Sequence, residues 1–410
     1  MKVPRQPELN IGLIGHVDHG KTTLTNALTG EWTDRHSEEI KRGVSIKLGY
    51  ADAALYRCKS CPEPECYTNT PICPKCGGET ELQRTVSFVD SPGHETLMAV
   101  MLSGAAVMNG ALLTIAANER CPQPQTREHL KALEILGTKD IVIVQTKIDL
   151  VSGERVKENY EEIKEFIKGS IAENSVIIPV SAYYNVNIDV LMKAIIEQFS
   201  LPDYYEDRKP LTSILRSFDV NRPGTKPQKL RGGVAGGSLA QGILRIGNEI
   251  EIRPGIKKEE HNRVRWDPLY TKIVSLRSGE LELKSARSGG LIAIGTSLDP
   301  SLTKADGLAG QTLGKPGSLP EILNNLTLGV SLLEKVIGLE EDMPVEPIKS
   351  MEPLMLSVGS ATTVGIVKSA RGDVIDVNLR MPVCPMKKQR VAISRRFGSR
   401  WRLIGYGIIK

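Results

Sequence analysis

The chain of 410 residues is long enough for two or three domains. Hydrophobic residues make up 40% and charged residues 25%, which excludes a collagen-like, low-complexity or mostly disordered chain. Lysine and arginine exceed aspartate and glutamate by 53 to 48, and this mild excess permits a nucleic-acid partner without requiring one. The excess gathers at the C-terminus, because no acidic residue follows Asp376 whereas nine basic residues do.

Residues 9–200 alternate short apolar runs with longer helical patterns. The predicted strands are 9–15, 47–56, 82–90, 111–116, 140–146 and 175–180. The predicted helices are 21–29, 95–107, 125–136, 154–171 and 188–199. This alternation predicts an α/β fold with a doubly wound, mostly parallel sheet, and we assign residues 1–200 to this first domain.

Two segments bear on the location of the protein. The first ten residues are polar and charged, so they lack the apolar core of a signal peptide. Residues 96–118 are uncharged and long enough to span a bilayer, but Ser103, Gly104 and Asn109 interrupt their middle. We therefore expect a buried helix, a turn and a buried strand there, and a cytoplasmic protein.

The pattern changes beyond residue 200. Residues 201–210 are polar and contain proline near both ends, so we interpret them as a linker. Short β-like runs separated by Gly-Gly, Pro-Gly and Ser-Gly pairs then continue to the C-terminus, which predicts two β-barrels. Residues 314–320 are rich in Gly and Pro, and we predict the boundary between the two barrels there. Domain II then covers residues 211–319 and domain III covers residues 320–410.

A phosphate-binding motif follows the first predicted strand. Gly15-His-Val-Asp-His-Gly-Lys-Thr22 matches G-x-x-x-x-G-K-[ST] and opens a helical pattern, which is the context that the motif requires. Backbone N–H groups at a helix N-terminus bind phosphates, Lys21 supplies positive charge, and the Thr22 hydroxyl completes a Mg²⁺ shell. The candidate nucleotide-binding residues of this loop are Asp18, His19, Gly20, Lys21, Thr22 and Thr23.

Two further segments are candidates for metal binding and hydrolysis. Asp90-Ser-Pro-Gly93-His94 ends a predicted strand, so Asp90 can hold Mg²⁺ through water while the Gly93 N–H senses a γ-phosphate. His94 can orient the attacking water, although a solvent-facing residue at a helix start is the alternative; His94 and Asp18 are the candidate catalytic residues. A Ser45 hydroxyl would be a second Mg²⁺ ligand, and its release on hydrolysis would free residues 32–45 as a switch.

The segment Thr146-Lys-Ile-Asp149 follows another buried strand. A carboxylate such as Asp149 accepts two hydrogen bonds from N1–H and the exocyclic amine of guanine, which adenine does not offer, so the motif predicts GTP rather than ATP. The Lys147 stem can cover the base. Ser181 and Ala182 would place a backbone N–H near the guanine oxygen, although an ordinary strand end explains Ser181 equally well.

Five of the seven cysteines lie between residues 58 and 76. Cys58-x-x-Cys61 and Cys73-x-x-Cys76 supply four thiolates, the closed tetrahedral set of a structural Zn²⁺ site. We therefore predict a zinc-binding insertion over residues 57–81. Iron–sulfur binding, disulfides and free thiols are the alternatives, and Cys66 could compete for the metal.

These motifs resemble a known family. Residues 15–22, 42–46 and 90–94, with the two predicted barrels, are similar to the translational GTPases of the elongation factor Tu type. The similarity is closer to the gamma subunits of archaeal translation initiation factor two and covers nearly the whole chain. The segments that carry it are the cysteine-containing insertion 57–81, called the ribbon below, and residues 36–43, 122–129, 295–306 and 394–407.

The resemblance implies a carrier of initiator methionyl-tRNA that hydrolyses GTP to GDP and phosphate. It implies alpha and beta subunits as partners, with alpha on the second domain and beta on the nucleotide domain. The assembled factor would dock on the small ribosomal subunit, and no membrane would be involved. The implied ligands are GTP or GDP, Mg²⁺ and a structural Zn²⁺. Thr146 stands where the family has Asn, so we expect weaker guanine affinity with selectivity kept by Asp149; Ser45 replaces the usual Thr but keeps the hydroxyl.

Two other functions remain open. A specialised elongation factor, for instance one delivering selenocysteinyl-tRNA, shares the fold, although we expect such a factor to carry a C-terminal RNA-binding extension. A regulatory GTPase subunit of a sulfate adenylyltransferase is the second, and the ribbon beside the switch does not fit it.

Overall fold

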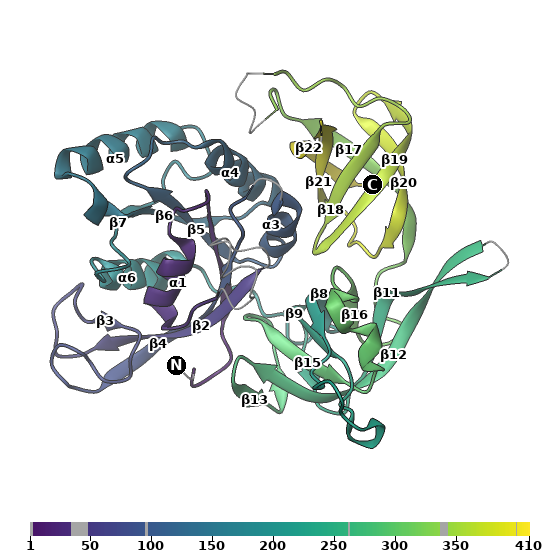
Figure 1. Cartoon of the computed structure of the whole chain (residues 1–410), viewed down its shortest axis with the longest axis horizontal. Coiled ribbons are helices and arrows are strands. Elements are labelled where there is room, and N and C mark those ends of the chain that lie inside the picture. Colours follow the sequence, from purple (N-terminus) through teal and green to yellow (C-terminus); the bar gives the residue numbers. More distant parts are fainter. Residues whose placement is uncertain (1–2, 34–47, 95–96, 261–262, 337–342, 399) are drawn as a thin grey trace. The chain divides into compact units, whose positions relative to one another are not determined.

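The chain forms two compact units in the computed structural model, which describes residues 3–33, 48–94, 97–260, 263–336, 343–398 and 400–410. The first unit comprises Met1–Pro202 with Lys335–Pro344, and the second comprises Asp203–Glu334 with Val345–Lys410. Helices and a sheet make up the first, and strands dominate the second (Figure 1). The predicted change from α/β to all-β structure is confirmed.

A seven-stranded sheet organises the first unit. Its strands are β1 (Leu9–Gly15), β2 (Gly49–Cys58), β3 (Tyr67–Thr68), β4 (Thr80–Asp90), β5 (Gly110–Ala116), β6 (Asp140–Thr146) and β7 (Ile177–Pro179). The order is β3-β2-β4-β1-β5-β6-β7, with parallel pairing from β4 to β7 and antiparallel pairing of β2 with β3 and β4. Every residue of the central strands β1 and β5 is buried, as expected for a sheet covered on both faces.

Helices cover both faces of this sheet. They are α1 (Lys21–Thr29), α3 (Met98–Ala105), α4 (Pro124–Leu136), α5 (Gly153–Ile167) and α6 (Ile188–Gln198). Figure 1 shows α3, α4 and α5 on one side and α1 with α6 on the other. Among the residues that the structure describes, no helix has the length and apolar character to cross a bilayer; the uncharged stretch is divided between α3 and β5.

Glycines in the left-handed region end several helices. Gly30 (φ 74°) ends α1 and donates its N–H to the Asn26 carbonyl at 2.7 Å, and Gly137 (φ 76°) ends α4. The prediction that α5 runs to residue 171 is wrong. Lys168 leaves the helical region with ψ 130°, and Gly169 follows with φ 71°, so the helix stops at Ile167.

Two closed six-stranded barrels form the second unit. In the first, β11 (Glu249–Glu260), β16 (Thr312–Gly314), β8 (Leu211–Phe218), β9 (Val234–Gln241), β15 (Ile292–Thr296) and β12 (Arg263–Ser278) pair in that order, and β11 pairs with β12 to close the ring. Three short strands accompany it: β10 (Leu244–Arg245), β13 (Leu281–Leu283) and β14 (Ser285–Ala286). Its core is aliphatic, with Ile214, Ile252 and Ile294 fully enclosed.

The second barrel is built wholly of antiparallel neighbours. Its strands are β17 (Leu323–Leu332), β20 (Val374–Val383), β19 (Ala361–Arg371), β18 (Pro353–Val358), β21 (Arg390–Phe397) and β22 (Arg400–Ile409). Leu328, Leu356 and Ile393 are fully buried in its core. The predicted α/β domain followed by two barrels is therefore confirmed as the fold of this chain.

Candidate functional site

The loop between β1 and α1 is shaped to bind an anion. Asp18 (φ 60°) and Gly20 (φ 80°) adopt the left-handed conformation, which turns the chain sharply into the N-terminus of α1. The Lys21 side chain folds back, and its Nζ donates to the carbonyls of Gly15 at 2.9 Å and His16 at 2.6 Å. Backbone N–H groups, a helix N-terminus and a buried ammonium group therefore converge, and these residues fit a nucleotide phosphate.

A buried carboxylate at the end of β4 lies next to the first turn of α1. The Oδ2 atom of Asp90 accepts a hydrogen bond from the Thr22 hydroxyl at 2.8 Å and another from the Thr33 hydroxyl at 2.6 Å. Hard oxygen ligands of this kind suit Mg²⁺, so Thr22 and Asp90 fit the predicted metal site. Thr33 belongs to the predicted switch segment 32–45 but was not singled out as a contact of Asp90; Ser45 and residues 36–43 lie outside the described residues.

Gly93 lies against the phosphate loop. A Cβ atom at this position would meet Lys21 Nζ at 2.6 Å and the Gly15 carbonyl oxygen at 2.8 Å, so the backbone comes as close as a glycine allows. His94 and Asp18 are both exposed. Their catalytic assignment stays a prediction.

The predicted guanine-binding residues lie at the carboxyl ends of neighbouring strands. The Thr146 hydroxyl, at the end of β6, donates to the His19 backbone carbonyl at 2.8 Å. Lys147 (φ 57°) starts a single turn that leaves Asp149 exposed. Ser181 follows β7, which pairs in parallel with β6, and its N–H donates to Val186 at 3.2 Å.

These segments form one edge of the sheet, because parallel strands end on the same side. The phosphate loop, the turn at 146–149 and residues 181–182 follow β1, β6 and β7 respectively. The structure thus brings the sequence-predicted nucleotide residues together, while their individual roles remain predictions.

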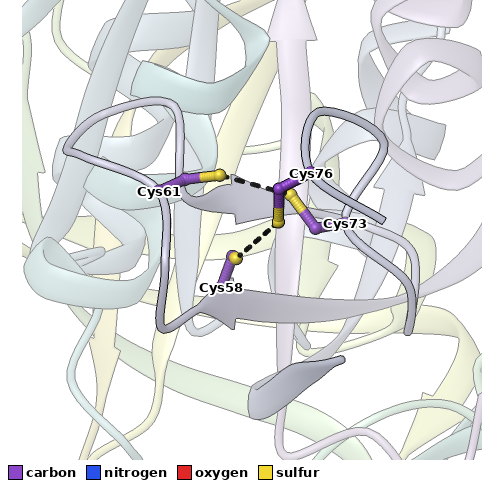
Figure 2. Close-up of side chains that lie close together, drawn as sticks. All are labelled: Cys58, Cys61, Cys73 and Cys76. Atoms are coloured by element: carbon purple, nitrogen blue, oxygen red, sulfur yellow. Dashed lines mark hydrogen bonds between the residues drawn. The ribbon is translucent and has the colours of Figure 1, made fainter. Parts of the chain in front are cut away.

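Four cysteines of the insertion between β2 and β4 converge (Figure 2). The Sγ atoms of Cys58 and Cys76 are 3.5 Å apart, those of Cys61 and Cys73 are 3.6 Å apart, and all four lie within 4.8 Å of one another. Zinc–sulfur bonds of about 2.3 Å give a tetrahedron with edges of about 3.8 Å, so the set fits a closed Zn²⁺ site. With four thiolates as ligands, such a site keeps no position open for catalysis.

Backbone amides favour the thiolate form at this cluster. N–H groups of Cys76 and Lys75 lower the pKa of Cys73 to about 6, and the Ser60 N–H lowers the pKa of Cys58. In the metal-free cluster the contact with Cys73 raises the pKa of Cys61 to about 12. A hydrogen bond from the Gly78 N–H lowers the pKa of Cys76, but contacts with Cys58 and Cys73 outweigh it, so that this pKa is raised. Cys66 is not one of the four, and it is buried in the core of the first unit.

Comparisons with known proteins agree with this geometry. The model of the elongation factor Tu GTP binding domain matches residues 6–200, and that of the C-terminal part of initiation factor eIF2 gamma matches residues 324–409. Translation initiation factor 2 subunit gamma of Archaeoglobus fulgidus is 61% identical over 404 residues, 98% of this chain and 95% of that protein. The same subunit of Methanocaldococcus jannaschii is 58% identical over 409 residues, 100% of this chain and 99% of that protein. The chain belongs to the gamma-subunit family of translation initiation factor 2.

Membership in the gamma-subunit family confirms the main functional prediction. The chain is a GTP-binding subunit of a translation initiation factor and a GTPase of the elongation factor Tu type. The two alternative functions are not favoured by these relatives.

Solved structures show the same fold at low identity. A bacterial selenocysteine-specific elongation factor superimposes with a TM-score of 0.74 at 24% identity, covering 98% of this chain and 58% of that one. Elongation factor SelB of Methanococcus maripaludis with the GTP analogue GppNHp gives a TM-score of 0.72 at 20% identity, covering 100% of this chain and 80% of that one. Gamma-subunit and selenocysteine-type factors therefore share an architecture.

The phosphate loop of this gamma-subunit family member contains His16 and His19, and His129 of α4 lies close enough to interact electrostatically with both. His19 places Nδ1 3.0 Å from the Thr114 carbonyl and Nε2 3.3 Å from Glu119 Oε2, and its ring lies edge-on to that of His16. Burial lowers the pKa of His19 to about 4 and that of His129 to about 3. The imidazoles of His19 and His129 are therefore neutral at physiological pH, and Lys21 is the cation of the loop.

The ribbon is fastened to the rest of its unit at two helices. The Asn69 side chain donates to the carbonyls of Ala27 at 3.3 Å and Leu28 at 3.0 Å, at the C-terminus of α1. Glu63 pairs with Lys193 of α6 at 2.5 Å. The predicted zinc insertion of this gamma-subunit relative is thus linked to the same helix that begins at the phosphate loop.

Sequence reasoning did not single out two residues that contact the predicted nucleotide residues. Thr33 and Glu119 carry no motif of their own, and each reaches its partner across the fold: Thr33 binds Asp90 and Glu119 faces His19. A hydroxyl residue shortly after the first helix was the only available signal for Thr33.

Proposed function

We propose that this chain carries initiator methionyl-tRNA to the small ribosomal subunit in the cytoplasm. It does so as the GTP-binding member of a heterotrimer with alpha and beta subunits, and it hydrolyses GTP to GDP and phosphate. The observation that carries the proposal is the 61% identity to an archaeal gamma subunit across 98% of this chain. The phosphate loop and the strand-end residues described above supply a site for the nucleotide.

In the proposed site, the phosphate groups of GTP lie against the N-terminus of α1. Lys21 exchanges its hydrogen bonds to backbone carbonyls for the terminal phosphates, because its ammonium group already lies within the loop. Thr22 and Asp90, with Ser45, would hold Mg²⁺, which when bound neutralises charge on the phosphates. Gly93 presents its N–H beside Lys21.

The remaining assignments concern the base and the attacking water. Asp149 accepts the N1–H and amine of guanine, Lys147 covers the ring, and Ala182 offers a backbone N–H to the guanine oxygen. His94 orients the water and Asp18 contacts the nucleotide from the loop. Exposure of His94, Asp18 and Asp149 at this edge of the sheet supports access by a ligand.

Basic residues of the second barrel supply a surface for tRNA. Two of the nine basic residues that follow Asp376 are not exposed: Arg402 is buried, and the half-buried Arg395 pairs with Glu352 at 2.5 Å. The other seven are exposed, and they are Arg380, Lys387, Lys388, Arg390, Arg396, Arg400 and Lys410. Contacts of these cations with phosphates would make tRNA affinity fall steeply with salt.

Filter binding of aminoacylated initiator tRNA to the full chain, loaded with GTP or with GDP, tests the proposal. We expect tighter binding with GTP, and weaker binding of deacylated initiator tRNA and of elongator methionyl-tRNA in both states. Equal affinity for initiator tRNA in the GTP and GDP states would contradict a nucleotide-dependent switch in tRNA binding. A pull-down from native extract, analysed for alpha and beta subunits, tests the heterotrimer separately.

A further inference from the structure

A threonine outside the phosphate and guanine motifs reaches the carboxylate of the predicted metal site. The Thr33 hydroxyl donates to Asp90 Oδ2 at 2.6 Å, and the Thr22 hydroxyl donates to the same oxygen at 2.8 Å. Thr33 is 7% exposed and Asp90 is fully buried, so bulk water competes little for this contact. The Asp90 carboxylate is therefore held between the first turn of α1 and a residue that follows the end of the same helix.

Local bonds at the end of α1 direct the chain to this position. Gly30 ends the helix in the left-handed region (φ 74°). The Thr29 hydroxyl donates to the Thr25 carbonyl at 2.7 Å and accepts the Glu31 N–H at 3.0 Å. The backbone that leads to Thr33 is thus held at the helix end, which limits where the Thr33 hydroxyl can lie.

The strand that pairs with β4 leaves room for Thr33. Gly49 begins β2 and lies opposite Asp90 in the antiparallel register. A Cβ atom on Gly49 would meet the Thr33 Cβ at 2.7 Å, closer than non-bonded carbon atoms pack, whereas the Asp90 Cβ would lie at 3.4 Å. Glycine at this position therefore allows the threonine to approach, and a side chain there would displace Thr33 more than the carboxylate.

Thr33 also belongs to the predicted switch segment 32–45, of which the residues from 34 onwards lie outside the described residues. The bond to Asp90 Oδ2 attaches the described start of that segment to the carboxylate that fits Mg²⁺. Thr22, which fits the same metal, donates to this oxygen as well. A single oxygen atom therefore joins the metal site, the phosphate loop and the start of the predicted switch.

We propose that Thr33 is a positioning residue for Mg²⁺, which acts through Asp90 by holding its carboxylate in place for the metal. Carboxylates at metal sites are commonly oriented by hydrogen bonds from residues that do not touch the metal, and loss of such a partner costs about 10- to 100-fold in metal affinity or activity. The inference rests on the proposed magnesium site of Thr22 and Asp90, and it adds to that site a residue that neither motif contains.

The test changes the contact of Thr33 in the full chain in three ways. T33V removes the hydroxyl but keeps the branched shape, T33S keeps the hydroxyl, and G49A pushes Thr33 away from Asp90 while leaving both residues unchanged. T85V is the matched control, because it removes a fully buried hydroxyl from β4 that lies five residues, about 16 Å, from Asp90.

Affinity for a fluorescent, non-hydrolysable GTP analogue is titrated from EDTA to saturating Mg²⁺. The Mg²⁺ concentration that gives half of the gain in affinity reports the metal site, whereas affinity in EDTA reports the phosphate loop and the fold. We expect T33V and G49A to raise that midpoint concentration at least about tenfold. Their affinity in EDTA should equal that of the parent chain. T33S should restore most of the loss, and T85V should match the parent.

Three results would overturn the inference. An unchanged Mg²⁺ midpoint in T33V would mean that the bond does not position the carboxylate, and a lower midpoint would mean that the hydroxyl competes with the metal. An equal loss of affinity with and without Mg²⁺ in both T33V and G49A would assign Thr33 a purely structural role. A parent chain whose affinity does not respond to Mg²⁺ would instead contradict the proposed magnesium site itself.

Discussion

The Thr146 hydroxyl donates a 2.8 Å hydrogen bond to the backbone carbonyl of His19. This contact joins the end of β6, where the guanine-binding turn begins, to the phosphate loop 127 residues earlier in the chain. The sequence comparison left open whether a Thr can replace the Asn of the family motif, because its side chain is shorter. The observed bond shows that the shorter hydroxyl side chain still reaches the phosphate loop.

We expect T146V to weaken GTP and GDP binding about tenfold. The valine keeps the shape but leaves the buried His19 carbonyl without this donor, and an unsatisfied buried group costs about 1 to 3 kcal/mol. Titration with a fluorescent GDP analogue measures the loss. T146S, which keeps the hydroxyl, is the matched control and should bind within about twofold of the parent chain; equal affinity of T146V would show that the bond is unimportant.

G93A should weaken GTP binding more than GDP binding. The new Cβ would approach Lys21 Nζ to 2.6 Å and the Gly15 carbonyl to 2.8 Å, so the segment must move away from the loop. We expect a loss of about tenfold for GTP, because the Gly93 N–H is proposed to reach only the γ-phosphate. Competition titrations of GTP and GDP against a labelled analogue decide this. An equal loss of affinity for GTP and for GDP would instead indicate general damage to the phosphate loop.

Acid should destabilise the nucleotide-free protein through its buried histidines. Burial lowers the pKa of His19 to about 4 and of His129 to about 3, whereas an unfolded histidine titrates near 6.5. Between these values the unfolded chain binds more protons, so unfolding free energy rises with pH and is lost as pH falls from about 6.5 towards 4. Denaturant unfolding of the parent chain and H129L at several pH values measures the slope. H129L should flatten it by up to about 1.4 kcal/mol per pH unit, and an unchanged slope would refute the assignment.

The comparison of sequence and structure shows where local patterns suffice. The helix Lys21–Thr29 was predicted to the residue, because a phosphate-loop motif fixes its start and Gly30 fixes its end. Two-residue β3 gave no signal, since a strand that short has no periodicity. Partners such as Glu119 for His19 depend on the sheet order, which no local pattern encodes.

Charge patterns were informative only in part. The sequence shows nine basic residues and no acidic residue after Asp376, yet Arg402 is buried and Arg395 bonds to Glu352 and to the carbonyls of Glu346 and Pro347. Sequence gives the sign of a charge, whereas its partner is set by neighbouring strands.

Metal removal should destabilise the first unit while leaving its nucleotide site formed. The four thiolates at Cys58, Cys61, Cys73 and Cys76 fit zinc, and the ribbon contacts α1 through Asn69 and α6 through Glu63. We expect C73S to lose the single bound zinc and to lower Tm by at least about 5 °C, because 1 kcal/mol corresponds to about 2 to 4 °C in a unit of this size. GDP affinity should change less than about threefold, because the cluster contributes no residue to the phosphate loop. C66A is the control, since Cys66 lies outside the four-sulfur set, and it should keep full zinc content by metal analysis. Full zinc content in C73S, or loss of zinc in C66A, would place the metal on a different set of sulfurs.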